Sequence, residues 1–323
     1  MTATVNYGKI QTRFTVNDQR ARTLLPFALL TAVLAVSTAS IFIRLAQQEA
    51  PSLVIATYRL TVASLILAPI ALAHHRDELR SLQRKDWLMA LLSGILLALH
   101  FATWVTSLEY TTVASSVVLV STAPLWVALL SPLVLREPPT KTVLIGMLLA
   151  LVGGAVIGLS DACAWKERLT CPPFNELFLG KAMWGNLLAL IGAWTVTGYL
   201  LIGRRLRQNI SLLTYIFLVY SMGAIVLLGI MFFAGQPPFG YTPLTYLWMI
   251  LLALVPQLIG HTTYNWALRY TSASFVAVTI LGEPVGSTIL AYFILQETPG
   301  WLKVIGAGLI LAGIWLASIT KKT

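Results

Sequence analysis

The sequence is poor in charged residues, in cysteine and in the short motifs that mark common enzymes. Charged residues make up 11% of its 323 positions and apolar residues 57%, which excludes an ordinary soluble domain. It contains no HExxH or GxSxG motif, no paired aspartates and no nucleotide-binding glycine loop. We therefore expect no cofactor and no enzymatic activity, with an intramembrane enzyme kept as a remote alternative.

The sequence holds instead a series of apolar runs of membrane-spanning length. A bilayer core of about 30 Å needs roughly 20 apolar residues per helix. Lipid leaves no water to satisfy an open backbone, so these runs predict helices rather than strands. The sequence predicts an all-α integral membrane protein with ten transmembrane helices. The predicted helices cover residues 24–45, 52–73, 87–108, 112–134, 141–160, 182–203, 210–234, 243–267, 271–294 and 301–320.

The chain consists of two copies of one unit. Shifting it against itself by 160 residues aligns residues 261–313 with residues 101–153 without a gap. Ungapped agreement of Pro, Glu, Gly and Tyr is hard to obtain by chance. The coinciding pairs are Tyr110 and Tyr270, Pro124 and Pro284, Glu137 and Glu297, Pro139 and Pro299, Gly146 and Gly306, Gly153 and Gly313, and, upstream, Arg44 and Arg204. Because each copy holds an odd number of helices, we expect the second copy to lie inverted relative to the first.

The basic residues predict which side of the membrane each loop faces. A net charge of +10 would suggest nucleic acid as the partner of a soluble protein, but in a membrane chain Lys and Arg mark the cytoplasmic side. With both termini cytoplasmic, the opposite side holds few basic residues, namely Arg44, Lys166, Arg168, Lys181 and Lys303. We expect a multi-pass protein of the inner or plasma membrane, with the lipid bilayer as its partner and no nucleic acid.

These helices and charges predict five segments. The first segment is polar and basic and lacks the apolar core of a cleaved signal peptide, so we expect the first helix to act as the insertion signal. The segments are a cytoplasmic tail (1–23), a first five-helix repeat (24–160), an extracytoplasmic loop (161–181), a second five-helix repeat (182–320) and a cytoplasmic C-terminus (321–323).

The two cysteines, Cys163 and Cys171, share the extracytoplasmic loop. An oxidising compartment permits a disulfide between them. A pair of free thiols is the other interpretation, and the sequence does not choose between the two. A metal site is not expected, because the loop contains no histidine and no further cysteine.

Polar and aromatic residues share a face of the predicted third helix. His100, Thr103 and Trp104 recur at spacings of three and four residues, and the predicted eighth helix repeats this pattern. A polar stripe inside a membrane faces the bundle interior, where it can serve either packing or solute binding. The candidate solute-binding residues are Arg59, His100, Thr103, Trp104, Trp194, Tyr199, Tyr264 and Asn265.

Two charged residues fall within predicted spans. Arg59 lies at a depth of about 10 Å and Glu283 at about 18 Å, from a rise of about 1.5 Å per residue. Charge at such depth must face protein or water. Arg59 has either a structural or snorkelling role, or a role in lining a cavity or fixing an anionic group. Glu283 either couples proton movement to substrate or supports a kinked helix, and pairing with Arg59 is one way to satisfy it.

Two prolines occupy matching places in the two copies, Pro124 and Pro284. A proline inside a helix removes one backbone hydrogen bond and bends the helix. Broken helices at matching places in two repeats indicate a binding site near the membrane midplane. We therefore assign a coupling or gating role to Pro124, Pro284 and Glu283.

Several runs carry a resemblance to a known family. They are LEYTTVASSVVLVSTAPLW at 108–126, LRE at 135–137 and NWALRYTSASFVAVTILGEPV at 265–285. The sequence resembles the EamA domains of the drug/metabolite transporter superfamily over nearly all of the chain after residue 24. The resemblance implies ten helices, cytoplasmic termini, a central cavity between two halves and, in similar bacterial members, export of amino acids or other small metabolites.

These features predict a gradient-driven transporter of a small organic metabolite, since no ATP-binding motif is present. Export of amino acids or related compounds by alternating access is our leading hypothesis. A multidrug carrier, a carrier for nucleobases or sugar derivatives, an importer and a channel are alternatives, and a scaffold or sensor is a remote one. Small residues on the predicted fifth and tenth helices, such as Gly154 and Gly308, suggest close helix packing. We expect a monomer or a weak homodimer.

Overall fold

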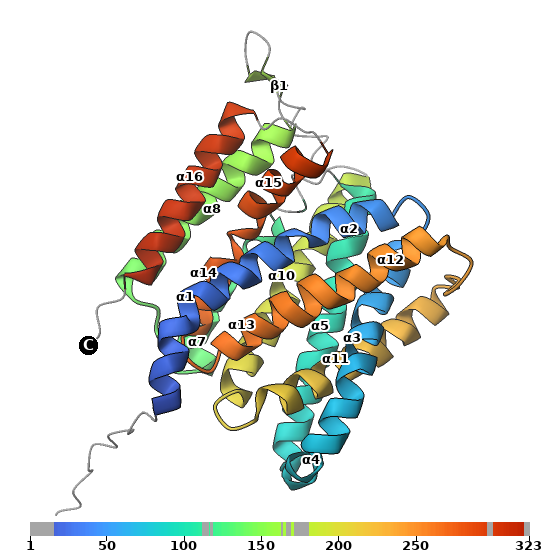
Figure 1. Cartoon of the computed structure of the whole chain (residues 1–323). Helices are drawn as coiled ribbons and strands as arrows, with labels where there is room; N and C mark the ends of the chain where they lie inside the picture. The colour runs from blue at the N-terminus through green and yellow to red at the C-terminus, as the bar shows by residue number, and fades with distance from the viewer. Residues whose placement is uncertain are drawn as a thin grey trace, which may run out of the picture.

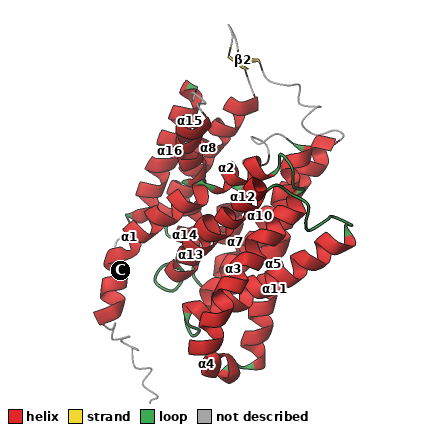
Figure 2. Ribbon diagram, turned by 45° about the vertical axis from the view of Figure 1, so that its right-hand side comes forward, coloured by secondary structure: helices red, strands yellow, loops and turns green. Residues whose placement is uncertain are grey.

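The protein is a helical bundle with one short hairpin (Figures 1 and 2). The computed structural model describes residues 16–111, 116, 119–162, 164–165, 169–170, 181–295 and 300–319. The helices of the first half are α1 (Val16–Ser37), α2 (Ala39–Ala46), α3 (Ser52–His74), α4 (Arg76–Ser81), α5 (Arg84–Tyr110), α7 (Ala123–Val134) and α8 (Lys141–Ala162). Strands β1 (Ala164–Trp165) and β2 (Leu169–Thr170) pair antiparallel.

The second half is also helical. Its segments are α10 (Lys181–Leu206), α11 (Leu212–Phe233), α12 (Pro243–Leu252), the π-helix η1 (Ala253–His261), α13 (Thr262–Ala267), α14 (Ala273–Ile280), α15 (Glu283–Leu295) and α16 (Trp301–Ser318). The side chains of Ser211, Thr242 and Ser272 cap α11, α12 and α14 by accepting a first-turn backbone hydrogen bond.

Seven helical segments are long and apolar enough to cross a membrane, so the chain is a multi-pass membrane protein. Three shorter apolar helices, Ala123–Val134, Lys141–Val156 and Val304–Ala317, accompany them in the described residues. The all-helical prediction for the membrane part is confirmed, whereas the count of ten spans stays a prediction.

Helix boundaries differ from the prediction at several places. The helix α1 begins at Val16, within the predicted tail, because residues 19–22 are good helix formers that continue the first span outward. The first span is also interrupted at Thr38, between α1 and α2. The predicted eighth helix is continuous but contains the π-helix η1, where Pro256 removes a backbone donor.

The two helices with matching prolines are broken rather than bent. A turn at Ser121 and Thr122 precedes α7, and a turn at Leu281 and Gly282 separates α14 from α15. Pro124 and Pro284 each occupy the second position of the following helix. A first-turn proline has no intrahelical hydrogen bond to lose, so each proline starts a new helix.

The helices α8 and α16 pack closely against each other and stand together at one side of the molecule (Figure 1). A Cβ atom on Gly146 would collide with the carbonyl oxygen of Gly313, and one on Gly153 with that of Gly306. These pairings show that the two helices run antiparallel. Gly154 and Gly308, which also suggested close packing, have nothing within 4 Å of an added Cβ and so take no part in this contact within the chain.

A glutamate on α4 joins the first half of the chain to the second. The carboxylate of Glu78 accepts hydrogen bonds from the backbone N–H and hydroxyl of Ser211 and from the hydroxyl of Thr214. His75 contacts the same carboxylate at 3.2 Å. We call Glu78, His75, Ser211 and Thr214 the Glu78 clamp. Burial raises the pKa of Glu78, but these hydrogen bonds outweigh it and lower the pKa to about 2.

A second glutamate forms a similar but exposed contact. Glu49, between α2 and α3, accepts hydrogen bonds from the backbone N–H and hydroxyl of Thr242 and from the hydroxyl of Thr245. These hydrogen bonds lower the pKa of Glu49. Both carboxylates therefore bind the first turn of a helix in the second half, where the helix dipole favours negative charge.

Candidate solute-binding site

Arg59 lies on α3, deep in the bundle, and its side chain is held at two points. It is 2% exposed, and its Nε donates a hydrogen bond to Oε1 of Gln257 on η1 at 2.7 Å. Its Cζ lies 4.0 Å from the centroid of the Phe101 ring on α5, a cation–π contact. Within the described residues, its two terminal nitrogens make no hydrogen bond, so four of the five N–H donors of the guanidinium are unused.

A chain of aromatic rings connects α5 to α13 beside Arg59. The ring of His100 stacks on Trp104 with centroids 5.8 Å apart and contacts Phe101 at 5.0 Å. Phe101 meets His261 edge-on at 5.4 Å, and His261 meets Tyr264 at 6.4 Å. His100 is anchored by Nδ1, which lies 2.9 Å from the carbonyl oxygen of Gly192. These rings form an amphipathic surface that suits the apolar part of a small solute.

Asn265 on α13 organises a network of hydroxyl groups. Its Nδ2 lies 2.6 Å from the hydroxyl of Tyr199 on α10 and 3.4 Å from that of Tyr220 on α11. Tyr220 also contacts the hydroxyl of Thr262 at 3.2 Å. The network joins α10, α11 and α13 to one another.

Four buried polar atoms in this region have no hydrogen-bond partner. They are Nε1 of Trp104, Nε2 of Gln257, the hydroxyl of Tyr264 and Oδ1 of Asn265. Two further unpartnered atoms, on Thr61 and Gln236, complete the set in the described part of the chain. An unsatisfied buried polar atom costs about 1 to 3 kcal/mol, so a concentration of such atoms at one place offers hydrogen bonds to a polar solute.

Glu283 is the first residue of α15 and interacts electrostatically with Arg59 and Tyr264. It forms no direct ion pair with Arg59, because the ion pairs among the described residues are those of Glu78 with His75 and Glu137 with Arg204. The side chain of Glu283 is half-buried, and its backbone carbonyl accepts a hydrogen bond from the hydroxyl of Ser37. We call Arg59, Gln257, Glu283, the ring chain and the Asn265 network the central cluster.

Six of the eight predicted binding residues belong to the central cluster, namely Arg59, His100, Trp104, Tyr199, Tyr264 and Asn265. The hydroxyl of Thr103 instead bonds its own helix, to the carbonyl of Leu99 at 2.7 Å. Trp194 is 44% exposed and packs edge-on against Trp126. Pro124 begins α7 outside the cluster, whereas Pro284 follows Glu283 directly. Cys163 and Cys171 lie outside the described residues.

The candidate list omitted five residues of the central cluster, namely Phe101, Tyr220, Gln257, His261 and Thr262. Phe101, Gln257 and Tyr220 resemble ordinary core residues in a sequence this apolar, and their roles depend on neighbours from distant helices. Pro256, beside Gln257, was the available signal, because a proline within a membrane span marks a local irregularity. His261 was visible as a counterpart of the His100 pattern but was not included.

The described residues offer no set of metal ligands. No three His, Cys, Asp or Glu side chains come together among them. His100 and His261 both contact the ring of Phe101. Two imidazoles alone fall short of the three or four ligands typical of a zinc site.

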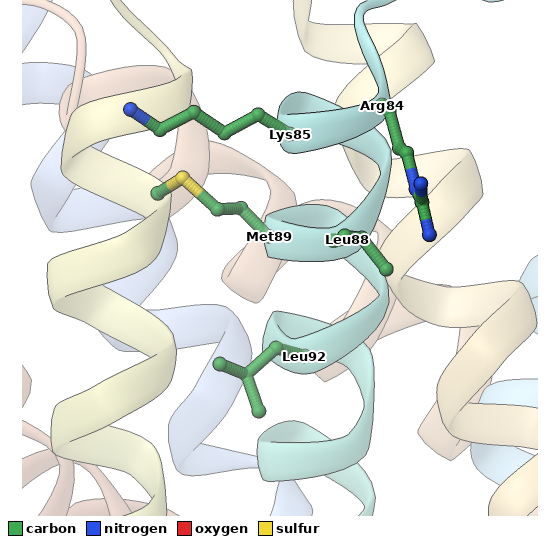
Figure 3. A pocket seen from close by; sticks show the side chains of 5 residues that line it. All are labelled: Arg84, Lys85, Leu88, Met89 and Leu92. Atoms are coloured by element: carbon green, nitrogen blue, oxygen red, sulfur yellow. The ribbon is translucent and has the colours of Figure 1, made fainter.

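A surface pocket of about 390 Å³ lies at the start of α5, away from the central cluster. Figure 3 shows its five lining side chains on successive turns of α5, with Lys85 and Met89 on one side and Arg84 on the other. The pocket contains none of the predicted binding residues, so we do not assign solute binding to it.

Comparison with known proteins identifies the family. The profile of the EamA-like transporter family matches residues 24–159 and, again, residues 183–319. The chain belongs to this family. The resemblance to this family is confirmed.

Relatives of this family member are also described as transporters. It is 24% identical over 86% of its length to an uncharacterized transporter of Archaeoglobus fulgidus, covering 91% of that protein. It is 25% identical over 91% of its length to the uncharacterized transporter YetK of Bacillus subtilis, covering 86% of it. This chain also resembles a protein of known crystal structure, with 17% sequence identity and a TM-score of 0.73. The match covers 92% of this chain and 97% of the other protein, so the two share a fold. These names indicate transport rather than catalysis.

Proposed function

We propose that this EamA-family member is a gradient-driven transporter that exports amino acids or related small metabolites by alternating access. The observation that carries the proposal is the central cluster, where buried polar atoms without partners surround Arg59. Its residues come from both halves: Arg59 from the first, and Gln257 and Glu283 from the second. A site at the junction of two repeats is the place where alternating access needs it.

An inverted relation between the two five-helix halves is supported by the packing of α8 and α16. Gly146 and Gly306 correspond in the repeat, as do Gly153 and Gly313. In the structure Gly146 meets Gly313 and Gly153 meets Gly306. The corresponding helices α8 and α16 therefore pack antiparallel, and each glycine contacts the counterpart of the other glycine on its own helix. A two-fold axis in the membrane plane would produce this arrangement.

The loop contacts support the same relation. The connection between α2 and α3, which holds Glu49, corresponds in the repeat to the connection between α10 and α11, which holds Ser211. The connection between α3 and α5, which includes Glu78 on α4, corresponds to the connection between α11 and α12, which holds Thr242. Glu49 binds Thr242, while Glu78 binds Ser211. Corresponding loops thus lie at opposite ends of the bundle. We place the Glu78 clamp and both termini on the cytoplasmic side of the inner or plasma membrane, in agreement with the basic residues.

Counterflow in proteoliposomes tests the proposal. Reconstituted protein should accelerate uptake of a labelled amino acid when the same compound is trapped inside, with saturable kinetics. Empty liposomes and liposomes with heat-inactivated protein serve as controls. Absence of flux across a panel of amino acids, nucleobases and sugar derivatives would overturn the proposal, and linear flux with unitary conductance would indicate a channel instead.

A further inference from the structure

We propose that the pocket at the start of α5 binds an anionic phospholipid. Arg84 and Lys85 hold the phosphate of its headgroup, and Leu88, Met89 and Leu92 contact one of its acyl chains. The pocket contains no residue of the central cluster, so this lipid is distinct from the transported solute. The proposal therefore stands apart from the question of which solute is moved.

The pocket combines charge and apolar surface on one face of a helix. Its five lining residues follow one another on α5 at spacings that place them on the same side of the helix. Figure 3 shows the two cations on the first turn and the three apolar side chains on the turns that follow. The volume of about 390 Å³ falls in the range of about 300 to 1,000 Å³ of small-molecule sites. A ligand that matches this order has an anionic end and an apolar tail.

The apolar part of the pocket faces the lipid. The helix α5 is long and apolar enough to cross the membrane, and it begins at Arg84. Leu88 is 56% exposed and Leu92 is 48% exposed, and an exposed leucine within a membrane span contacts acyl chains. Eight residues of helix place Leu92 about 12 Å from Arg84 along the helix axis. The pocket therefore extends from the headgroup region into the hydrocarbon, as a phospholipid does.

The two cations of the pocket have no acidic partner within the chain. Among the described residues the ion pairs join other groups, and both Arg84 and Lys85 are exposed. Asp86 follows them in the first turn of α5 but does not line the pocket. Arg and Lys near a membrane surface attract anionic lipids, which lie in the cytoplasmic leaflet, on the side where we place the Glu78 clamp. A lipid phosphate would supply the counter-charge that the chain does not.

The end of α10 adds positive charge to the same region. A Cβ atom added to Gly185 would meet Thr111 and one added to Gly198 would meet Leu96, so α10 runs antiparallel to α5 and ends near its start. Arg205 is exposed in the last turn of α10. The exposed cations at this end, Arg76, Arg80, Arg84, Lys85 and Arg205, outnumber the acids of α4 and the first turn of α5, Asp77, Glu78 and Asp86. This excess favours an anionic headgroup over a zwitterionic one.

Native mass spectrometry of the purified full-length protein tests the proposal. The protein is incubated in detergent with equal amounts of dioleoyl phosphatidylglycerol and dioleoyl phosphatidylcholine, which have the same chains and differ in headgroup charge. We expect one phosphatidylglycerol to be retained in preference to phosphatidylcholine by about tenfold. Glycerol 3-phosphate, which has the phosphate but no chains, should not displace it at equal concentration.

Two double variants with the same change in net charge locate the headgroup site. Arg84→Gln/Lys85→Gln should remove most of the preference for phosphatidylglycerol. Arg76→Gln/Arg80→Gln removes the same charge from α4, outside the pocket, and should keep most of the preference. All four side chains are exposed, so we expect both variants to fold.

A matched pair of single variants tests the acyl-chain site. Leu92→Trp fills the apolar part of the pocket and should reduce retention of phosphatidylglycerol although both cations remain. Leu65→Trp makes the same change on α3, where Leu65 is 66% exposed and lies outside the pocket, and should leave retention unchanged.

The proposal is wrong if the two lipids are retained equally, if both double variants lose the preference to the same extent, or if glycerol 3-phosphate displaces the lipid. A dimer of the wild-type protein that dissociates in Leu92→Trp but not in Leu65→Trp would assign the pocket to a second copy of the chain instead. If a variant does not fold, the comparison of the two lipids and the competition with glycerol 3-phosphate decide on the wild-type protein.

Discussion

The Glu78 clamp and the central cluster are both polar groups built around a glutamate, and they differ in how far the chain itself satisfies them. Glu78 accepts hydrogen bonds from a backbone N–H and two hydroxyl groups. The carboxylate of Glu283 accepts none within the described residues, and four buried polar atoms of the central cluster lack partners. A polar network whose hydrogen bonds are all made within the chain stabilises the fold. A network with unmade hydrogen bonds can still form them with a ligand.

The largest stability effect should come from removing the acceptor of the clamp. Glu78→Ala leaves the N–H of Ser211 and the hydroxyl of Thr214 without their partner, so the free energy of unfolding should fall by roughly 1 to 3 kcal/mol. Chemical or thermal unfolding in detergent measures this. Asp77→Ala, one residue away and exposed, is the matched control. Glu283→Gln should lower stability less than Glu78→Ala does, and the reverse order would contradict the comparison.

Acid should remove the contribution of the clamp in a defined pH range. The pKa of Glu78 is lowered from 4.5 to about 2 in the folded protein. Its contribution is therefore complete above about pH 4.5 and is lost as the pH falls through about 2. The difference in melting temperature between wild type and Glu78→Ala should shrink across this range. A constant difference from pH 5 to pH 2 would show that the carboxylate charge does not act through these hydrogen bonds.

Two tyrosines allow the same comparison within the bundle, at a smaller scale. The hydroxyl of Tyr215 lies 2.8 Å from that of Ser93, whereas the hydroxyl of Tyr264 has no partner. Tyr215→Phe should cost about 1 kcal/mol, because a hydrogen bond is lost and Ser93 is left buried. Tyr264→Phe should leave the unfolding free energy at or above that of wild type. Equal losses in both variants would show that the Tyr264 hydroxyl is satisfied in the folded protein.

The smallest effect is expected at Glu49. Glu49→Gln removes an acceptor charge from Thr242 and Thr245, but the group is exposed and water replaces the lost interaction. The unfolding transition should shift less than in Glu78→Ala, and salt should reduce the shift further. A shift as large as that of Glu78→Ala would mean that solvent exposure does not make the Glu49 contact less stabilising than the Glu78 clamp.

Much of the fold was predictable because membrane insertion makes strong demands on local sequence. Apolar runs of sufficient length marked the spans, and Pro124 and Pro284 marked the places where helices break. The π-helix η1 was not predicted, since a single proline does not reveal how the backbone around it will repair its hydrogen bonds. The start of α1 at Val16 was missed, because a helix can continue beyond the apolar run that identifies it.

The candidate site was predictable in part for a similar reason. His100, Trp104, Tyr264 and Asn265 stood out as polar or aromatic residues on apolar helices. Trp194 looked equivalent to them in sequence, yet 44% of its surface is exposed. Gln257 could not be selected, because its importance comes from Arg59, which lies 198 residues away in the chain.

The sequence by itself determined that this protein is a helical membrane protein with two related halves, because burial in lipid and internal repetition leave marks in the order of residues. Only the tertiary structure decided which polar groups find partners. That outcome depends on how helices distant in the chain approach one another, so Glu78 is satisfied by Ser211, while Arg59 and Glu283 form no ion pair with each other among the described residues.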